Sequence, residues 1–401
     1  MLHRLVTLGR WFGALTLAGG IALAANPISG PKKDGGFETS APYAILIEAD
    51  GGTVLFEKAA DQLVAPASLA KLMTAEVVFN EIKEGNVTLD EEFVISENAW
   101  RKGGAPSGGS TMFARLHSRI KVEDLLHGVI IQSGNDACIA LAEGIAGNVS
   151  DFARLMNARA RELELTKSNF TNPAGLPDPD MRVTVRELAK LSQHIIATYP
   201  DFYRWYAEPE FTWNKIRQQN RNPLLAMNIG ADGLKTGFTK EAGYGLVGSA
   251  VQNGMRLIVV VNGLKSEKER ADEAKRLLEW GFHGFESRLL FTEGQYVGEA
   301  KLFGGEKGRV PLIGPKAIKL MVPRNSNDRI IARIVYNGPV PAPVEKSQPI
   351  GLLKIWRGEN VALEVPLQAA ESVGTGSTTQ RAFDAAAEIV IGLFRAGAKK
   401  L

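Results

Sequence analysis

Three short segments of the chain carry side chains that together could catalyse acyl transfer. They are, in chain order, Ser68-Leu69-Ala70-Lys71, Ser133-Gly134-Asn135 and Lys235-Thr236-Gly237. A serine hydroxyl becomes a nucleophile when a neighbouring base takes its proton, and a neutral lysine amine can be that base. The order and spacing of the three segments are typical of serine hydrolases that use a serine–lysine pair. The sequence therefore predicts an active-serine acyl-transfer enzyme.

The first segment is expected to open a helix that begins near Pro66-Ala67-Ser68 and continues past Val77. Residues three apart on a helix share a face, with Cβ atoms roughly 5–6 Å apart, so Lys71 should lie beside the Ser68 hydroxyl. A second cation close to Lys71 would lower its pKa, and Lys235 is the residue expected to provide it. The positive end of the helix dipole would also favour negative charge developing at Ser68.

The other two segments are expected to place polar side chains around that serine. Ser133 and Asn135 fall between two helical patterns, and a loop there suits side chains that reach into a cleft. The stretch 232–239 has the pattern of a strand whose glycines allow a ligand backbone to approach closely. Lys235 and Thr236 would then bind an anionic group, and a peptide could add antiparallel to the strand edge.

Each segment alone has a simpler interpretation. Ser68 could be a helix N-cap with Lys71 in solvent, Ser133 could lie in a capping turn, and Lys235 could serve only to keep an edge strand from pairing. The occurrence of all three segments in one chain favours catalysis.

Longer stretches make the chain similar to a known family, the low-molecular-mass penicillin-binding proteins that are D-alanyl-D-alanine carboxypeptidases of peptidase family S11. The stretches that carry the resemblance are 65–74, 132–137, 211–218, 220–222, 232–239 and 278–282. The resemblance covers residues 37–370. It implies an α/β (α+β) catalytic domain like that of serine β-lactamases and penicillin-binding proteins. This domain has an antiparallel sheet with a helical cluster, and a small all-β C-terminal domain follows it.

The resemblance also implies a role for each residue of the first two segments. Ser68 is the acylated nucleophile and Lys71 is its proton acceptor. Ser133 is the third catalytic residue, and with Asn135 it completes the proton network. Asn135 also contacts the substrate amide.

In the third segment the resemblance implies substrate-binding roles for Lys235, Thr236, Gly237 and Phe238. Lys235 and Thr236 bind the terminal carboxylate or stabilise the charge of the site, and the backbone amides of Ser68 and Phe238 form the oxyanion hole. Some well-known relatives carry a polar residue such as histidine where this chain has Phe238. That departure leaves the substrate preference and the deacylation rate open.

The implied activity is removal of the terminal D-alanine from peptidoglycan pentapeptide side chains through a Ser68 acyl-enzyme, with β-lactams as covalent inhibitors. No cofactor or metal is expected. Three alternatives remain open. A DD-endopeptidase would cleave cross-links with the same residues, a class A β-lactamase would need a deacylating glutamate, and a cell-wall scaffold would bind penicillin without catalysis.

Four further residues outside the three segments could bind a ligand or react. Arg217, Arg221 and Arg256 are candidates for a further carboxylate contact, although a loop arginine can equally form a surface ion pair. The single cysteine, Cys138, lies in an apolar helical pattern and is expected to be a buried hydrophobe rather than a thiol nucleophile. With 23% charged residues and a net charge of +3, the chain is not expected to bind nucleic acid.

The N-terminus predicts export. His3, Arg4 and Arg10 precede an apolar run, 11–24, that is shorter than the about 20 residues needed to span a bilayer. This pattern is typical of a cleaved signal peptide, and the alternative is an uncleaved anchor.

The expected parts of the chain are a signal peptide 1–24, a linker 25–38, a DD-peptidase catalytic domain 39–286, a β-rich domain 287–372 and an amphipathic helix 379–401.

The expected location is the periplasm, with the C-terminal helix lying on the outer face of the inner membrane. The alternative for that helix is packing on the β-rich domain.

Apolar periodicity predicts the remaining elements. Between 89 and 219 the chain is expected to be mostly helical, at 122–131, 136–146, 149–163 and 184–197. Strands are expected at 41–48, 53–57, 233–239, 244–250 and 255–263, a helix at 268–285 and a hairpin at 353–365.

Overall fold

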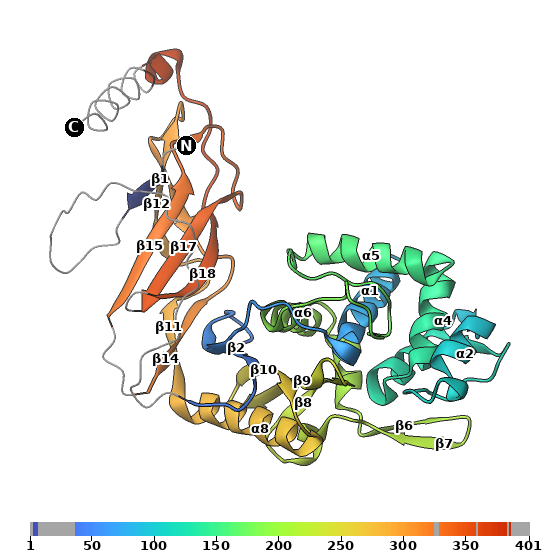
Figure 1. Cartoon of the computed structure of the whole chain (residues 1–401). Coiled ribbons are helices and arrows are strands. Elements are labelled where there is room, and N and C mark those ends of the chain that lie inside the picture. The colour runs from blue at the N-terminus through green and yellow to red at the C-terminus, as the bar shows by residue number, and fades with distance from the viewer. Residues whose placement is uncertain (1–2, 7–36, 325–328, 358–359, 383–384, 386–401) are drawn as a thin grey trace. The chain divides into compact units, whose positions relative to one another are not determined.

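The computed structural model describes residues 3–6, 37–324, 329–357, 360–382 and 385. These residues fall into two compact units, with the boundary between Gly284 and Phe285 (Figure 1). The larger unit contains Ser68, Ser133 and Lys235.

A five-stranded antiparallel sheet forms the middle of the larger unit. Its strands run in the order β3-β2-β10-β9-β8, with the bounds β2 (Tyr43–Glu48), β3 (Val54–Lys58), β8 (Ala231–Thr239), β9 (Gly243–Gln252) and β10 (Met255–Leu264). Ile45 of β2 lies opposite Val260 of β10, so strands from the two ends of the unit pair as expected. β8 carries Lys235 and lies at an edge of the sheet, which leaves one side of it without a paired strand.

The two faces of this sheet are covered by different helices. Side chains alternate along β10, so Ile258 and Val260 join the core of the helical cluster while Leu257 faces α8 (Glu267–Gly284). A Cβ at Gly281 of α8 would lie 2.7 Å from Leu257 Cδ1. Glycine at this position therefore lets α8 pack closely against the sheet.

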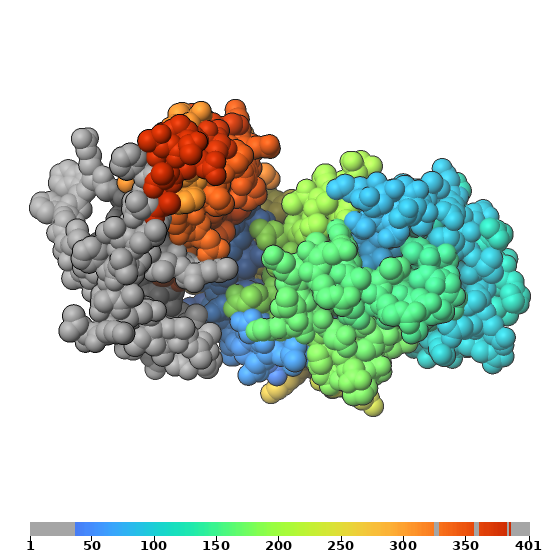
Figure 2. Space-filling model, turned by 90° about the horizontal axis from the view of Figure 1, so that it is seen from above, coloured from blue at the N-terminus to red at the C-terminus, as the bar shows by residue number. Residues whose placement is uncertain are grey.

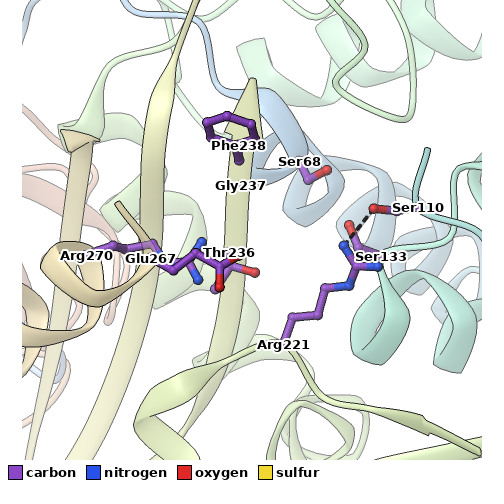
Figure 3. Close-up of a pocket in the computed structure, with 9 residues that line it drawn as sticks. All are labelled: Ser68, Ser110, Ser133, Arg221, Thr236, Gly237, Phe238, Glu267 and Arg270. Atoms are coloured by element: carbon purple, nitrogen blue, oxygen red, sulfur yellow. Dashed lines mark hydrogen bonds between the residues drawn. The ribbon is translucent and has the colours of Figure 1, made fainter. Parts of the chain in front are cut away.

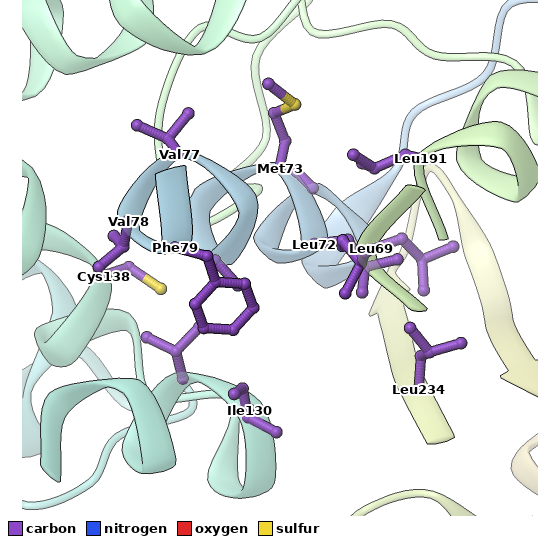
Figure 4. Packing of buried hydrophobic residues seen from close by; sticks show 14 of the residues in the cluster. Leu69, Leu72, Met73, Val77, Val78, Phe79, Ile130, Cys138, Leu191 and Leu234 are labelled. Carbon is purple, nitrogen blue, oxygen red and sulfur yellow. The ribbon is translucent and has the colours of Figure 1, made fainter. Parts of the chain in front are cut away.

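The helical cluster is built around α1 (Lys71–Lys83). Leu72 and Phe79 of α1 are fully buried. They pack in one core with Cys138, Leu191 and Leu234, which lie on α4, α6 and β8 (Figure 4). Cys138 is thus buried, as expected, and burial raises the pKa of its thiol to about 11. The other helices are α2 (Glu97–Gly103), α3 (Val122–His127), α4 (Asn135–Ala146), α5 (Val149–Glu162), α6 (Val185–Thr198) and α7 (Pro200–Tyr203). In the space-filling view these helical segments form one closely packed surface (Figure 2).

The region predicted to be mostly helical differs from the prediction in two respects. It also holds two small two-stranded sheets, β4 (Glu92–Val94) with β5 (Arg119–Lys121) and β6 (Glu210–Trp213) with β7 (Ile216–Gln219). The helix expected at 122–131 changes to a π-helical turn at Gly128–Gln132. Gly128 packs against Met112, and its carbonyl accepts a hydrogen bond from the Gly134 N–H. This widened turn ends the helix directly before Ser133.

The smaller unit consists mainly of β-strands, which confirms the expected β-rich C-terminal domain. A seven-stranded sheet has the order β1-β15-β17-β18-β13-β12-β16, and β11 pairs with β14 in a second sheet. The predicted hairpin lies within β17 (Pro349–Arg357) and β18 (Asn360–Ala369). The other strands are β11 (Phe285–Phe291), β12 (Tyr296–Phe303), β13 (Arg309–Ile313), β14 (Ile318–Pro323), β15 (Ile330–Asn337) and β16 (Val340–Pro341).

The chain ends are described only in part. β1 (His3–Val6) pairs antiparallel with β15 and falls inside the predicted signal peptide, and the rest of that segment lies outside the described residues. Residues 378–382 form a helical turn, and 385 is also helical. The remainder of the predicted amphipathic helix lies outside the described residues. None of the helices that the structure describes is both long and apolar enough to cross a membrane.

Candidate active site

The structure brings Ser68 and Lys71 together at the start of α1. Ser68 lies in a 3₁₀ turn, Ala67–Ala70, and the α-helix itself begins at Lys71. The helical segment therefore begins at Ala67, as predicted, and Ser68 lies in its first turn, which is 3₁₀ rather than α-helical. The Lys71 Nζ is 2.9 Å from the Ser68 Oγ, as the spacing of the two residues predicted.

The other contacts of the Lys71 amine show which way the proton of Ser68 can move. Nζ is 2.8 Å from Asn135 Oδ1 and 2.5 Å from the carbonyl oxygen of Ala174. Both oxygens can only accept hydrogen bonds, so they occupy the two N–H groups of a neutral amine. The remaining lone pair then points to the Ser68 hydroxyl. The geometry thus suits Lys71 as a base toward Ser68.

Burial, together with the charge of the nearby Arg221 guanidinium, lowers the pKa of Lys71 to about 8. Lys71 is 1% exposed, so its charged form loses most of its hydration. Arg221, which was not expected in this role, is a second cation that lowers the pKa of Lys71. Lys71 and Lys235 also repel each other, and the charge of Lys71 helps to lower the pKa of Lys235. That Lys235 in turn lowers the pKa of Lys71 stays a prediction.

A loop at 172–176 holds the Ala174 carbonyl over Lys71. The Asn172 Oδ1 accepts from the backbone N–H groups of Ala174 and Leu176, and the Thr74 hydroxyl donates to the Pro173 carbonyl at 2.6 Å. Among the described residues no carboxylate forms a hydrogen bond or ion pair with the Lys71 amine. A class A β-lactamase needs a deacylating glutamate, whereas the third contact of this amine is a backbone carbonyl.

The second segment lies where the π-helical turn meets α4. Ser133 has a φ of 65° and is 2% exposed, and its Oγ lines the pocket without a hydrogen-bond partner among the described residues. Asn135 joins Lys71, whereas the Ser133 hydroxyl makes no contact that completes a proton network. That part of the expected network stays a prediction.

Asp136 holds this segment in place, although the sequence analysis did not single it out. Its buried carboxylate accepts hydrogen bonds from the Thr111 hydroxyl and from the backbone N–H groups of Met112 and Ala114. These contacts fasten the stretch 110–114 to the start of α4. Asn135 is held in addition by its N–H, which donates to the Ser110 carbonyl at 2.8 Å.

The third segment lies on β8, at the edge facing the serine turn. Lys235 and Thr236 are both buried, and the Lys235 Nζ donates to the Thr236 carbonyl at 3.1 Å. A Cβ at Gly237 would lie 3.1 Å from both Leu69 Cγ and the Pro66 carbonyl oxygen. The space at Gly237 is therefore filled by the serine turn itself, so this glycine is required by internal packing rather than by the approach of a ligand backbone.

A pocket of about 370 Å³ joins the three segments (Figure 3). Its lining consists of Ser68, Ser110, Ser133, Arg221, Thr236, Gly237, Phe238, Glu267 and Arg270. Arg221 donates to the Ser110 hydroxyl at 2.8 Å (Figure 3), so of the three candidate arginines it is the one that reaches the pocket.

The other two candidate arginines are held in ion pairs away from the pocket. Arg217 pairs with Glu210 across the β6–β7 hairpin. Arg256 forms a two-pronged pair with Asp232 and also contacts the Tyr203 hydroxyl. Neither lines the pocket, so these two arginines form ion pairs within the protein, which was the alternative to a contact with a substrate carboxylate.

Arg270 is a second pocket arginine that the sequence analysis missed. It lies on α8, is 6% exposed, and its Nε has no hydrogen-bond partner among the described residues. Its guanidinium lies over the ring of Tyr244, 5.6 Å from the centroid, and burial lowers its pKa. A buried, incompletely bonded guanidinium at a pocket wall is suited to an anionic ligand.

The pocket thus carries more buried positive charge than its own carboxylates balance. Burial and the charges of Lys71 and Arg221 lower the pKa of Lys235 well below its usual value. Glu267, at the start of α8, is the carboxylate among the lining residues, and it is exposed. A bound carboxylate would supply the missing opposite charge and favour the charged form of Lys235.

The fold and this site define a serine hydrolase of the penicillin-recognising class, with a serine–lysine pair at the start of a helix that packs beside an antiparallel sheet. Residues 29–266 match the family described as D-alanyl-D-alanine carboxypeptidase, peptidase S11, and residues 285–375 match the C-terminal domain of penicillin-binding protein 5. The chain belongs to the S11 family of D-alanyl-D-alanine carboxypeptidases.

Individual relatives agree with this family assignment. The chain is 37% identical over 381 residues to D-alanyl-D-alanine carboxypeptidase DacA of Haemophilus influenzae, covering 93% of this chain and 96% of the relative. It superposes on penicillin-binding protein 5 from Haemophilus influenzae with a TM-score of 0.75 at 37% identity, over 85% of this chain and 100% of that one. Penicillin-binding protein D2 of Listeria monocytogenes in its cefotaxime-bound form matches with a TM-score of 0.57 at 31% identity, over 62% of this chain and 100% of that one.

Proposed function

We propose that this protein is a serine-type D-alanyl-D-alanine carboxypeptidase that removes the terminal D-alanine from peptidoglycan pentapeptide side chains. The observation that carries the proposal is the contact between the Ser68 hydroxyl and the buried Lys71 amine. Ser68 lines a pocket whose two arginines, together with the buried Lys235 beside Thr236, suit a free carboxylate. The names of its S11 relatives support the same reaction.

The reaction proceeds in two acyl-transfer steps. Neutral Lys71 takes the proton of Ser68 as the Oγ attacks the carbonyl carbon of the penultimate residue, and that proton passes to the leaving amine of D-alanine. Water then attacks the ester carbonyl and gives a proton to Lys71, which passes a proton to the departing Ser68 Oγ. The shortened peptide leaves, and the free serine and the neutral lysine are restored. Backbone amides of Ser68 and Phe238 would stabilise the oxyanion in both steps.

Substrate binding is assigned to the edge of β8. The stem peptide adds antiparallel to this edge, Asn135 contacts its amide, and Lys235, Thr236 and Arg270 surround its terminal carboxylate. A β-lactam mimics the acyl-D-alanyl-D-alanine end of the peptide and leaves a slowly hydrolysed ester on the serine. The cefotaxime-bound relative supports this inhibition.

The experiment that tests the function is mass analysis of the products of purified pentapeptide and of a cross-linked peptide dimer. Release of free D-alanine from the pentapeptide, with the dimer left intact, is the expected result. Cleavage of the dimer at a comparable rate would favour the DD-endopeptidase alternative. Penicillin binding without turnover of either peptide would favour a non-catalytic scaffold.

The carboxylate site gives a quantitative prediction. We expect Thr236→Val to lower kcat/KM for a substrate with a free C-terminal carboxylate, because the lost hydroxyl can no longer bond that group. Hydrogen bonds to charged groups contribute about 1.5–3 kcal/mol, which corresponds to a loss of about ten- to a hundredfold. A substrate with an amidated C-terminus should lose less. The control is Thr212→Val on β6, which is exposed and lies outside the pocket. An equal loss on both substrates would contradict the role of Thr236 in carboxylate recognition.

The proposed location is the periplasm, with peripheral attachment to the outer face of the inner membrane through the segment 379–401. The basic and apolar N-terminal pattern of residues 1–24 supports export, and the amphipathic pattern of 379–401 supports surface binding. Truncation after Ser377 should move the protein from the membrane pellet to the soluble periplasmic fraction while penicillin binding persists. Unchanged fractionation would favour packing of the helix on the β-rich domain.

A further inference from the structure

A second groove lies beside the active-site pocket and shares one residue with it. The groove has a volume of about 700 Å³. The side chains of Tyr43, Phe238, Tyr244, Lys240 and Lys265 contribute to its lining. Phe238 also lines the active-site pocket. A ligand that leaves the pocket past Phe238 would therefore enter this groove.

Backbone atoms at the end of the sheet form part of the groove wall, so the groove does not depend on side-chain conformation alone. Gly243 has a φ of 69°, and a Cβ there would lie 2.9 Å from the carbonyl carbon of Gly263, so the backbone alone forms this part of the wall. Phe238 stacks on Tyr244 with ring centroids 4.1 Å apart and an interplanar angle of 27°. Phe238 remains 49% exposed, which leaves an aromatic face available to a ligand.

The charge of the groove is positive. Lys240 and Lys265 are exposed, and among the described residues neither side-chain amine has a hydrogen bond or ion pair. Glu241, the acidic residue of the lining, is paired with Arg182. Glu269 accepts from the Ser40 hydroxyl and from the Lys265 backbone N–H, and the charge of Lys265 helps to lower its pKa without forming an ion pair with it. The two lysines thus suit an acidic ligand.

The direction of the substrate along β8 determines which part of it reaches the groove. If Lys235 and Thr236 bind the C-terminal carboxylate, an antiparallel peptide runs with its earlier residues toward the end of β8. It then passes Phe238 and Thr239 and arrives at Lys240. The groove therefore lies on the upstream side of the scissile bond.

We propose that this groove is an extended substrate subsite that binds an acidic peptide segment upstream of the D-alanyl-D-alanine end, with Lys240 and Lys265 contacting its carboxylates. The proposal rests on the proposed carboxypeptidase function. It adds that the segment upstream of the D-alanyl-D-alanine end increases the affinity of the enzyme for its substrate. Phe238 and Tyr244 contact the apolar atoms of the same segment.

The test compares three substrates: an acyl-D-alanyl-D-alanine tripeptide without upstream residues, a pentapeptide with free upstream carboxylates, and the same pentapeptide with those carboxylates amidated. The variant is the double substitution Lys240→Gln with Lys265→Gln. For the acidic pentapeptide we expect KM to rise by about two- to fivefold per lysine, since exposed charge pairs contribute modestly, with kcat unchanged. Added salt should reduce this difference between variant and native protein.

The matched control is Lys268→Gln, because Lys268 is exposed, pairs with Asp272 on α8 and lines neither the pocket nor the groove. Hydrolysis of the tripeptide by every variant reports on the proposed carboxypeptidase function independently of the groove. If the double variant leaves KM for the acidic pentapeptide unchanged, or raises it equally for the amidated one, the subsite proposal is wrong. If the native protein does not hydrolyse the tripeptide, the proposed function itself is wrong.

Discussion

Replacing Ser68 with alanine is expected to abolish covalent labelling of the protein by a β-lactam. The acyl group would then have no hydroxyl with which to form an ester at the position that Lys71 activates. Intact-mass spectrometry after incubation with penicillin measures this directly, because the native protein should gain one penicilloyl group per chain. Hydrolysis of the pentapeptide should fall to the background rate in the same variant.

Two other serines in the pocket provide the control for this result. Ser110 and Ser133 line the same pocket as Ser68, but the Ser110 hydroxyl contacts Arg221, and Ser133 has no hydrogen-bond partner among the described residues. Neither is within hydrogen-bond distance of Lys71, so neither has a base in this structure. Ser110→Ala should still form the adduct. An adduct that persists in Ser68→Ala would identify one of these serines as the nucleophile instead.

The serine–lysine pair could be predicted from sequence because its geometry is local. Ser68 and Lys71 are three residues apart, so a helical turn places them on one face, and in the structure the Lys71 Nζ is 2.9 Å from the Ser68 Oγ. The strand that carries Lys235 was also predictable, because alternation and flanking glycines mark it. The three segments could be placed in one site only through their resemblance to a family, since periodicity alone does not fix which loops meet across a sheet.

The residues that sequence reasoning missed act through long-range contacts. Arg270 lies on a surface helix whose pattern gives no sign that one arginine turns into the pocket, and Asp136 resembles any acidic residue in a first helical turn. The Ala174 carbonyl has no side chain to mark it, yet it occupies one N–H of the Lys71 amine. The π-helical turn before Ser133 depends on close packing of Gly128 against Met112, which only the folded chain reveals.

Lys71→Arg is expected to lower the rate of Ser68 acylation by about 10²–10⁴-fold, the usual cost of losing a general base. The guanidinium keeps the positive charge but has a pKa above about 12, so it cannot accept the serine proton. The measurement is the rate of adduct formation with a β-lactam under single-turnover conditions. Lys83→Arg is the matched control, because Lys83 ends the same helix and is exposed. This control should acylate at the native rate.

The pH dependence of acylation distinguishes a base from a merely structural lysine. Burial sets the pKa of Lys71 to about 8, and only the neutral amine can take the proton, so the rate should rise with pH and level off above that value. At pH 7 about a tenth of the molecules would carry the neutral amine. In Lys71→Arg the residual rate should lack this rise, because the guanidinium stays charged throughout. A variant that retained both most of its acylation rate and the native pH profile would show that another group takes the proton of Ser68. The buried Lys235, whose pKa is also lowered, would be the first residue to examine.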